Sequence, residues 1–366
     1  MASGLYNGCT LKGSRIMGLH MTQPSSRIDA LKPDTPVKQV VVIGTSTGGI
    51  SALRELLGQL PSNLPAAVFV TMHIGDHASL LPNFLAKATP LEVRFALPEE
   101  RIRNGHVYVA PPDRHLLVEQ GRLRLVRSAK ENHSRPAIDP MFRSAAISYG
   151  NRAIGVLLTG ELDDGVIGLQ AIKAYGGVAL VQDPETAPAP SMPESALRHV
   201  EVNACLPPEG LGRLLAQTVE QRRMQPPSAG ESKRIEPFAT ENDLTYDLSA
   251  GGAQALSSIG AVSGISCPEC GGGLWELGLS PPRFRCHTGH SYTSSTLLRC
   301  QDASVEEALW VAVRALHEKQ LLIGRLAQSS KEAGRNSALE EYELADQELE
   351  SHKAALKALI TRLRPQ

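Results

Sequence analysis

The chain has 366 residues, which is enough for about two domains of ordinary size, and 42% of its residues are hydrophobic, which suffices for a packed core. Its formal net charge of −1 gives no overall field that would attract nucleic acid or an anionic membrane surface. The sequence has neither an apolar run of roughly 18 residues, the length of a membrane span, nor the basic-then-apolar start of a signal peptide. We therefore expect a soluble, cytoplasmic protein that neither binds nucleic acid nor inserts into a membrane.

The first half of the chain has the pattern of an α/β protein. Residues 1–36 show no periodicity and are punctuated by Gly, Ser and Pro, which predicts a disordered leader. In residues 37–220, short apolar runs alternate with helical patterns, as is typical of a doubly wound, mostly parallel sheet. The runs around Gly105 and Gly121 predict an antiparallel hairpin insertion. The predicted strands are 39–44, 66–72, 92–95, 106–110, 114–118, 122–126, 154–159 and 177–182, and the predicted helices are 49–59, 78–87, 139–149, 164–174, 192–198 and 207–222.

The second half of the chain divides into three further segments. Residues 221–262 are rich in Pro, Ser, Gly and charge, which predicts a linker. Residues 263–300 contain a cluster of cysteines and histidines and predict a small zinc-ribbon-like module. Residues 301–366 are rich in Ala, Leu, Glu, Lys and Arg, with a break near 329–336, which predicts two amphipathic helices in a hairpin that docks a partner.

The glycine-rich turn GTSTGG, residues 44–49, directly follows the first predicted strand and precedes a helical pattern. A Gly-x-Ser-x-Gly turn in this position is the arrangement of a nucleophile elbow, which would expose Ser46 above the sheet. A phosphate-binding turn and an ordinary strand-to-helix connection are the alternatives. A dinucleotide site has the pattern Gly-x-Gly-x-x-Gly and an acid ending the second strand. Here Ser46 and Thr47 interrupt the glycines and His73 ends the second strand, which favours catalysis.

A serine nucleophile needs a base and an acid that orients the base. His73 ends the second predicted strand as Ser46 ends the first, and neighbouring parallel strands deliver the side chains at their carboxyl ends to one crevice. The acid is expected from the turn TGELDDG, residues 159–165, which follows another apolar run. Asp163 and Asp164 are both candidates, and either one could instead cap the next helix. Sequence spacing alone does not choose between the two aspartates.

Several motifs occur in the order typical of one enzyme family. They are GTSTGG (44–49), a histidine ending the next strand, RPAIDPMFRSAA (135–146), LLTGELDDG (157–165), VQDPETA (181–187) and MPESAL (192–197). Over residues 37–220 the chain resembles the CheB-type chemotaxis protein-glutamate methylesterase domain. The resemblance implies a serine carboxylesterase that hydrolyses glutamate γ-methyl esters on the cytoplasmic helices of chemoreceptors, deamidates some receptor glutamines and needs no cofactor for catalysis.

The same resemblance implies a role for each matching residue. Ser46 corresponds to the nucleophile, His73 to the base and Asp164 to the acid. The backbone N–H of Glu161 occupies the position of an oxyanion donor, and the N–H of Thr47, beside the nucleophile, is the second donor that we expect.

Two features depart from the family pattern. Glu161 and Leu162 stand where the family usually has Met-Gly. A glutamate carboxylate that pointed inward would oppose a developing oxyanion, and a leucine restricts a turn that glycine makes freely. Two-component members also carry an N-terminal receiver domain, for which residues 1–36 are too few, so we expect a receiver-less protein.

The cysteines and histidines of the second half have the spacing of a zinc site. Cys267-x-x-Cys270 is followed by Cys286 and by His287 and His290, and three thiolates with one imidazole form a closed tetrahedral site for structural zinc. A redox Cys-x-x-Cys pair and a reduced pair of core cysteines are the alternatives. The fragment CPECGG…WE…FRCxxGHxY resembles a ribbon found behind some receiver-less family members, and this resemblance implies His290 as the fourth ligand.

The sequence therefore predicts a methylesterase that acts on methylated chemoreceptor helices, with C-terminal helices that dock chemosensory signalling proteins. A catalytically silent scaffold with the esterase fold is one alternative, kept open by Glu161 and Leu162. An acyl hydrolase for small esters is another.

Overall fold

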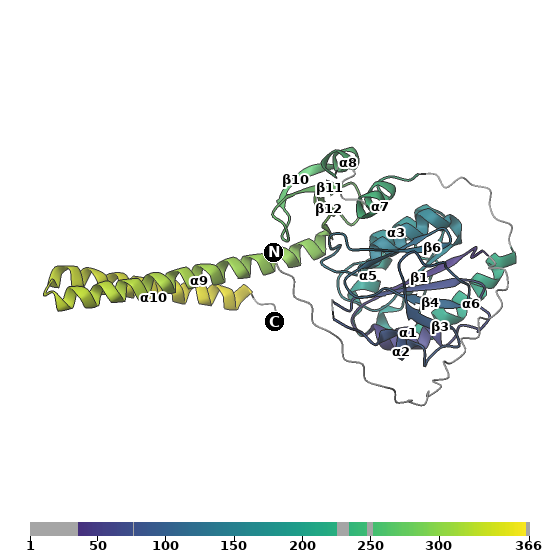
Figure 1. Ribbon diagram of the computed structural model, residues 1–366, viewed down its shortest axis with the longest axis horizontal. Helices are drawn as coiled ribbons and strands as arrows, with labels where there is room; N and C mark the ends of the chain where they lie inside the picture. Colours follow the sequence, from purple (N-terminus) through teal and green to yellow (C-terminus); the bar gives the residue numbers. More distant parts are fainter. Residues whose placement is uncertain (1–35, 76, 225–233, 247–251, 364–366) are drawn as a thin grey trace, which may run out of the picture. The chain divides into compact units, whose positions relative to one another are not determined.

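The structure of the protein is a computed structural model, which describes residues 36–75, 77–224, 234–246 and 252–363. The predicted leader, apart from Pro36, lies outside the described residues. The catalytic half is built on a parallel sheet with helices on both faces (Figure 1). The predicted doubly wound α/β fold is confirmed.

The parallel sheet has seven strands in the order β3-β4-β2-β1-β7-β8-β9. All six neighbouring pairs run parallel. The strands are β1 (Val40–Thr45), β2 (Ala67–Met72), β3 (Glu92–Phe95), β4 (His106–Val109), β7 (Ala153–Leu157), β8 (Val178–Gln182) and β9 (Ala204–Leu206). Alternate side chains of β1 enter two different cores. Val40 and Val42 pack in one core, and Val41 and Ile43 pack in the other. Residues 40–43 are all apolar because both faces of the strand are buried.

Helices cover both faces of this sheet. One core contains side chains of α3 (Ile138–Tyr149), α4 (Val166–Ala174) and α5 (Ser191–His199). The other contains side chains of α1 (Gly49–Leu57), α2 (Leu81–Leu85) and α6 (Pro208–Met224). Each helix follows a strand, so the carboxyl ends of β1, β2 and β7 open at the same edge of the sheet, where ligand sites of such folds lie.

Two details of the sheet differ from the sequence prediction. β4 joins the parallel sheet between β3 and β2, so the runs around Gly105 are not an antiparallel hairpin; only β5 (His115–Glu119) and β6 (Arg122–Val126), around Gly121, pair antiparallel. Val107, Tyr108 and Val109 are fully buried, as a strand inside a parallel sheet requires. The short edge strand β9 was not predicted, because its three residues include only a weak apolar signal.

The predicted linker 221–262 is wrong where the structure describes it. It contains the end of α6, then α7 (Phe238–Tyr246), α8 (Gly252–Ile259) and the start of β10 (Gly260–Ser266). The Pro, Ser and Gly content concealed a few apolar anchors, since Phe238, Leu244 and Leu256 are buried. A small antiparallel sheet follows, in the order β10-β11-β12-β13, with β11 (Gly273–Leu277), β12 (Arg283–Cys286) and β13 (Ser291–Thr293).

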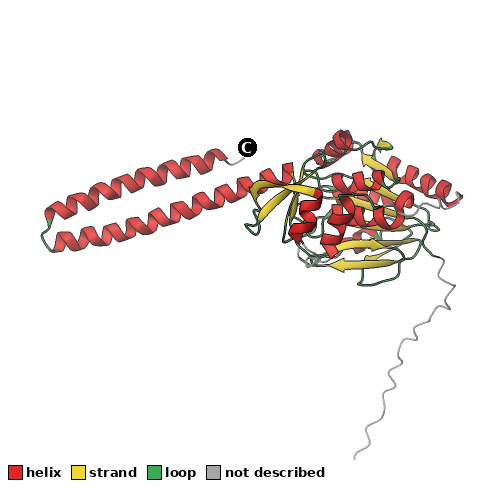
Figure 2. Cartoon of the chain, turned by 90° about the horizontal axis from the view of Figure 1, so that it is seen from above, coloured by secondary structure: helices red, strands yellow, loops and turns green. Residues whose placement is uncertain are grey.

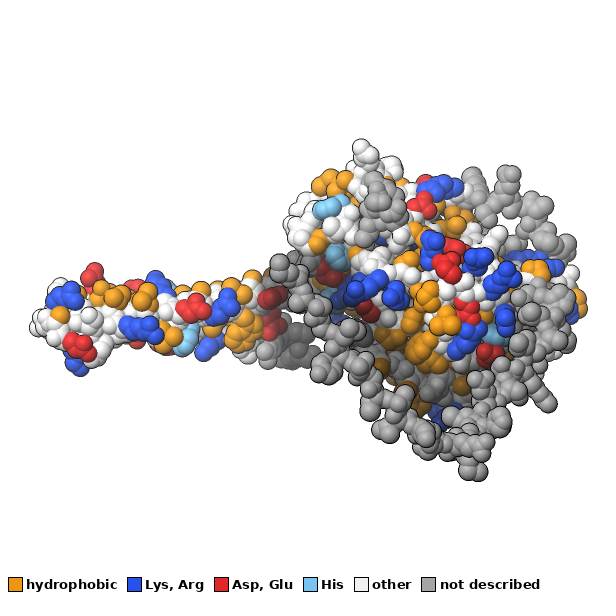
Figure 3. Space-filling model, in the orientation of Figure 1, with side chains coloured by type: hydrophobic (Ala, Val, Ile, Leu, Met, Phe, Trp, Pro, Cys, Tyr) orange, Lys and Arg blue, Asp and Glu red, His pale blue; other side chains and the backbone are white. Residues whose placement is uncertain are grey.

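Two long helices end the described chain. α9 (Ser294–Glu332) and α10 (Asn336–Leu363) lie side by side as a hairpin, as the composition predicted (Figure 2). α9 begins directly after β13, where Thr293 caps it by accepting a hydrogen bond from Thr296 N. Charged and apolar side chains are interspersed along the hairpin (Figure 3). None of the helices in the described ranges is long and apolar enough to cross a membrane.

A buried cluster of charged side chains joins the catalytic half to the C-terminal sheet. This arginine cluster consists of Arg143 on α3, Arg283 and Arg285 on β12, Glu241 on α7, and Glu131 and Asp139 of the catalytic half. All six side chains are at most 1% exposed. Arg283 alone binds three carboxylates, with Nη2 2.6 Å from Glu131, Nη1 2.8 Å from Asp139 and Nε 2.7 Å from Glu241.

The arginines keep two of the three buried carboxylates, those of Glu131 and Glu241, ionised. Burial raises the pKa of the third, Asp139, to about 7 although Arg283 lies beside it. Burial alone would raise the pKa of Glu131, but the guanidinium groups of Arg143, Arg285 and Arg283 bring it well below its ordinary value. The pKa of Glu241 is lowered in the same way against burial, first by Arg283. The two arginines of β12 neutralise acids of the catalytic half. Without the other half, each half would therefore be left with charges that have no counter-ion.

Arg283→Met is expected to lower the free energy of unfolding by about 3–5 kcal/mol, because it leaves buried carboxylates without their cation. Urea denaturation measures this loss. Arg198→Met, at an exposed position of α5, is the matched control and should change the free energy by less than about 0.5 kcal/mol. Equal stability of the two variants would contradict a structural role for the cluster.

Candidate active site

Ser46 lies in the sharp turn between β1 and α1. Its N–H donates to Thr159 O at 2.9 Å and its carbonyl accepts from Gly49 N at 3.0 Å, which fixes the turn. Gly48 has a φ of 78°, a left-handed conformation that favours glycine, and a Cβ there would lie 3.0 Å from Pro188. The glycines of the motif thus allow the chain to turn at the end of the strand and present Ser46 at the sheet edge.

The structure brings together Ser46, His73 and Asp164, from the ends of β1, β2 and β7. His73 Nδ1 lies 3.1 Å from Ser46 Oγ, and His73 Nε2 lies 2.8 Å from Asp164 Oδ2. The His73 side chain is 22% exposed, whereas that of Asp164 is only 3% exposed. This is the order of a serine, a base and an orienting acid.

Asp164 accepts four hydrogen bonds. Besides His73, Oδ2 accepts from Ile138 N at 2.7 Å, while Oδ1 accepts from Asn132 Nδ2 at 2.8 Å and from Asp139 N at 3.2 Å. The two backbone donors belong to the first turn of α3, where N–H groups are free and the helix dipole favours negative charge. Burial would raise the pKa of Asp164, but the bonds from His73, Ile138 and Asn132 hold it below its ordinary value.

Asp163 points away from this group, toward the C-terminal module. Its Oδ1 accepts from Thr293 Oγ1 and, at 3.2 Å, from Thr296 Oγ1, at the start of α9. Burial raises the pKa of Asp163. The geometry therefore separates the two aspartates that sequence spacing left open: Asp164 faces His73, and Asp163 holds α9.

The turn after β7 passes directly beside the serine. A Cβ on Gly160 would lie 3.0 Å from Ser46 Cβ. Among the described residues none accepts a hydrogen bond from the N–H of Thr47 or of Glu161. Leu162, which departs from the family's glycine, has a φ of 64° and donates its N–H to Ser191 Oγ at 2.8 Å.

A cavity of about 560 Å³ opens above the serine. Its floor is the catalytic half, and its opposite wall comes from the C-terminal module and the first turns of α9. The lining residues are Ser46, His73, Asn132, His133, Ser134, Glu161, Leu162 and Asp164 on one side and Pro268, Glu269, Thr296, Arg299, Cys300, Ala303, Ser304 and Glu307 on the other. The C-terminal segments therefore shape the space that a substrate would occupy.

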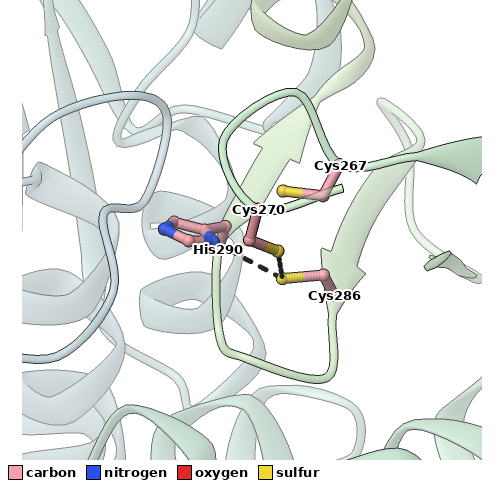
Figure 4. A group of neighbouring side chains, drawn as sticks. All are labelled: Cys267, Cys270, Cys286 and His290. Atoms are coloured by element: carbon pink, nitrogen blue, oxygen red, sulfur yellow. Dashed lines mark hydrogen bonds between the residues drawn. The ribbon is translucent and has the colours of Figure 1, made fainter. Parts of the chain in front are cut away.

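The ligand atoms of Cys267, Cys270, Cys286 and His290 all lie within 4.8 Å of one another (Figure 4). Cys286 Sγ lies 3.7 Å from Cys270 Sγ and 3.6 Å from His290 Nδ1. Sulfurs at the usual zinc distance of about 2.3 Å in a tetrahedron would be roughly 3.8 Å apart, so the four side chains fit such an ion. A hydrogen bond with Cys267 leads the causes that lower the pKa of the Cys286 thiol to about 7, toward the thiolate that binds metal.

Glu269, inside the Cys-x-x-Cys turn, connects this cluster to the active-site cavity. Its carboxylate lies 3.4 Å from His290 Nε2, the nitrogen opposite the one that faces the cysteines, and 3.2 Å from His133 Nδ1 of the catalytic half. A carboxylate on the second nitrogen of a ligating histidine fixes the orientation of the ring. His287 is outside the group of four, so the geometry favours His290 as the fourth side chain.

Comparison with known proteins places the chain in a family. The profile of the CheB methylesterase family matches residues 41–215. A Leptospira interrogans protein designated a candidate protein-glutamate methylesterase/protein-glutamine glutaminase is 37% identical over 190 residues, which are 50% of this chain and 98% of that protein. The chain belongs to the CheB methylesterase family. The family assignment drawn from the ordered motifs is thereby confirmed.

Other CheB relatives are longer than the matched segment. A protein-glutamate methylesterase/protein-glutamine glutaminase of Anaeromyxobacter dehalogenans is 38% identical over 199 residues, 54% of this chain and 58% of its own length. The crystal structure of the Thermotoga maritima CheB methylesterase catalytic domain has 34% identity and a TM-score of 0.47, covering 49% of this chain and 98% of that one. The family profile, at residues 41–215, lies within the catalytic half.

Sequence reasoning missed Asn132 and the arginines of β12. Asn132 lies between predicted elements and belongs to none of the quoted motifs, so its contact with Asp164 has no signal in the sequence. Arg283 and Arg285 alternate with Phe284 and Cys286 as an exposed strand face would, yet both are buried.

Leu162→Gly is expected to be more stable than Leu162→Ala by about 1 kcal/mol, because a left-handed conformation costs an L-residue that much and glycine nothing. Thermal and urea unfolding measure the difference. Leu197 on the helix α5 is the control position, where the glycine variant should be the less stable one by about 1 kcal/mol. The same sign at both positions would contradict strain at Leu162.

Proposed function

We propose that this CheB-family chain is a serine esterase that hydrolyses glutamate γ-methyl esters on chemoreceptor-like proteins and deamidates glutamine side chains at the same site. The observation that carries the proposal is the hydrogen-bonded sequence of Ser46, His73 and Asp164 at the carboxyl edge of the parallel sheet, inside a cavity. Relatives named protein-glutamate methylesterase/protein-glutamine glutaminase support glutamate esters and glutamines of proteins as the substrate class, and the family resemblance supports chemoreceptors as those proteins. Since the receptor helices of this family are cytoplasmic, we place the activity in the cytoplasm.

The proposed reaction has two halves. Ser46 Oγ attacks the ester carbonyl while His73 Nδ1 takes its proton, and Asp164 holds the imidazole through Nε2. The N–H groups of Thr47 and Glu161 bind the oxyanion. His73 then returns the proton to the leaving oxygen, so methanol departs and an acyl-enzyme remains. Water, deprotonated by His73, attacks the acyl carbon and releases the glutamate carboxylate and free Ser46.

The α9–α10 hairpin is proposed as the segment that binds chemosensory signalling proteins. Its exposed apolar side chains support this, with Trp310 43%, Leu321 55% and Leu344 60% exposed on helices that otherwise carry many charges. If the protein is a scaffold, the hairpin still binds signalling proteins but Ser46 catalyses no reaction. If the protein is an acyl hydrolase, the same residues catalyse hydrolysis of a small ester in place of a protein ester.

Asp164→Asn is expected to lower kcat about 10⁴-fold, because the imidazole loses its orienting acid, and Ser46→Ala should abolish turnover. Asp163→Asn is the matched control and should keep kcat within about tenfold, since that carboxylate faces Thr293 and Thr296. Methanol release from methylated receptor measures each rate.

The outcomes of this assay separate the three functions. Turnover of methylated receptor that Ser46→Ala abolishes supports the methylesterase. Wild-type protein without turnover on any ester supports the scaffold. Turnover confined to small esters supports the acyl hydrolase. A larger loss in Asp163→Asn than in Asp164→Asn would contradict the assigned acid.

We further propose that Cys267, Cys270, Cys286 and His290 hold a structural zinc ion, which would fix the Cys-x-x-Cys turn and β13 without entering the chemistry. Metal analysis should find about one zinc per chain, lost in His290→Ala and in Cys267→Ser. His287→Ala is the matched control and should keep the metal. A folded wild-type protein free of metal, or loss of zinc in His287→Ala alone, would contradict the site.

A further inference from the structure

Asn132 connects the C-terminal module to the catalytic acid. It is 7% exposed and has a φ of 49°, in the loop before α3. Its N–H donates to Ser291 O at 2.7 Å, and its Oδ1 accepts from Thr293 N at 3.1 Å, both on β13. Its Nδ2 donates to Asp164 Oδ1 at 2.8 Å and to Asp139 Oδ2 at 2.9 Å. Every hydrogen-bonding group of the side chain is therefore engaged.

The orientation of this amide is decided by Thr293. A side-chain amide offers an acceptor on one side and two donors on the other. Because the N–H of Thr293 requires the acceptor, the NH₂ group must face the two carboxylates. In the reversed orientation Oδ1 would face Asp139 and Asp164, and the NH₂ group would face an N–H, so all three contacts would be repulsive.

β12 strengthens the same arrangement from a second side. Arg283 Nη1 lies 2.8 Å from Asp139 Oδ2, the oxygen that also accepts from Asn132. Arg283 Nη2 donates to Ser291 Oγ at 3.1 Å, beside the carbonyl that holds the Asn132 backbone. The C-terminal sheet thus fixes both the backbone and the amide of Asn132, although among the described residues the hydrogen bonds of the His73 ring go to Ser46 and Asp164 and to none of that sheet.

We propose that Asn132 is a positioning residue of the Ser46–His73–Asp164 group and that the C-terminal sheet, through the N–H of Thr293, keeps its amide directed at Asp164. The esterase half would then be fully active only with β13 docked on it. This inference rests on the proposed catalytic roles of Ser46, His73 and Asp164.

The consequence for His73 has a definite sign. A donor on Asp164 withdraws negative charge from the carboxylate that faces the imidazole, so loss of that donor stabilises the imidazolium. The charged groups that face the cavity around His73 are Asp164, His133, Glu161, Glu269, Arg299 and Glu307. Behind Asp164 lies Asp139 on α3, which accepts from the same Asn132 amide and whose pKa burial raises to about 7. The neutral imidazole is the base, so the acid limb of the rate profile should move to higher pH when Asn132 no longer donates.

Thr293 permits a matched pair of variants in the full-length protein. Its φ of −75° suits proline, and Tyr292 before it is already extended in β13. Thr293→Pro and Thr293→Val both lose the hydroxyl that binds Asp163, but only the proline variant loses the N–H that binds Asn132. The ratio of the two rates therefore reports the contact between the backbone nitrogen of residue 293 and Asn132 Oδ1, where proline replaces the N–H by a ring carbon.

The readout is the rate at which a fluorophosphonate labels Ser46, measured against pH. Ser46 Oγ displaces fluoride from phosphorus and its proton passes to His73, so labelling needs the assembled group but no receptor substrate. We expect Thr293→Pro to be slower than Thr293→Val on the order of tenfold. Its acid limb should lie higher by about half a pH unit or more.

Asn132→Gly keeps the left-handed backbone and removes the amide. It should slow labelling and raise the acid limb as Thr293→Pro does. In the Asn132→Gly background, Thr293→Pro and Thr293→Val, which lose the same hydroxyl, should differ in rate by less than about twofold. Asn132→Gly with the wild-type rate and acid limb overturns the proposal, even where Thr293→Pro does not fold. Equal rates for Thr293→Pro and Thr293→Val, or the same ratio of these two rates with and without the Asn132 amide, overturn it as well.

The same labelling separates this inference from the proposed function. The wild-type protein could be labelled, with no labelling in Ser46→Ala, and still not hydrolyse methylated receptor. That result would contradict the proposed substrate and leave the inference about Asn132 standing. Wild-type protein that is not labelled overturns both.

Discussion

A buried carboxylate governs the architecture of this site. Asp164 lies beside the His73 imidazole at 3% exposure with its pKa held below the ordinary value, although an isolated charge at such a position costs several kcal/mol. The fold meets this requirement with four donors that come from three parts of the chain: His73 after β2, the first turn of α3, and Asn132. The position of α3 is therefore a condition of the chemistry as well as of the packing.

The same requirement extends outward to the C-terminal module. The N–H of Thr293 donates to Asn132 Oδ1, which directs the NH₂ group of Asn132 toward Asp164. The same NH₂ group donates to Asp139, whose carboxylate also binds the guanidinium of Arg283. Along the line from Asp164 through Asn132 and Asp139 to Arg283, each buried group is hydrogen-bonded to the next, and in an interior of low dielectric an unpaired group there would be costly. The arginine cluster is consequently an interface that two halves of one chain form together, and Asp163 and Glu269 add contacts on the side of the cavity.

The sequence was sufficient wherever one local pattern determines one local structure. Val40 to Ile43 are apolar because both faces of β1 are buried, so the strand and the Ser46 turn after it were predictable. His73 followed from its place at the end of the neighbouring strand. Spacing did not decide between Asp163 and Asp164, because adjacent residues in a turn point in directions that only the tertiary structure sets; the choice of Asp164 came from the family resemblance.

The remaining failures have a common physical cause. α7 and α8 were taken for a linker, because their anchors Phe238 and Leu256 are single residues among small and polar ones, and their burial depends on surfaces distant in sequence. Arg283 and Asn132 are polar residues that interact with partners distant in the sequence, so neither periodicity nor a local motif identifies them as buried. Burial of charge is a property of the assembled fold and is absent from local composition.

The departure at Glu161 and Leu162 bears on function through the backbone. An oxyanion is held by an N–H, which every residue but proline has, so the side chain of Glu161 matters only through its charge and direction, and that residue is exposed. Leu162 keeps a φ of 64°, the left-handed conformation that glycine would adopt freely. The turn has therefore retained its backbone course beside Ser46 although the residue that makes this course easy has been lost. A conformation maintained against a cost of about 1 kcal/mol must be held by its surroundings. Here these surroundings include the hydrogen bond from Leu162 N to Ser191 Oγ and the bond from Gly160 N to Ala189 O.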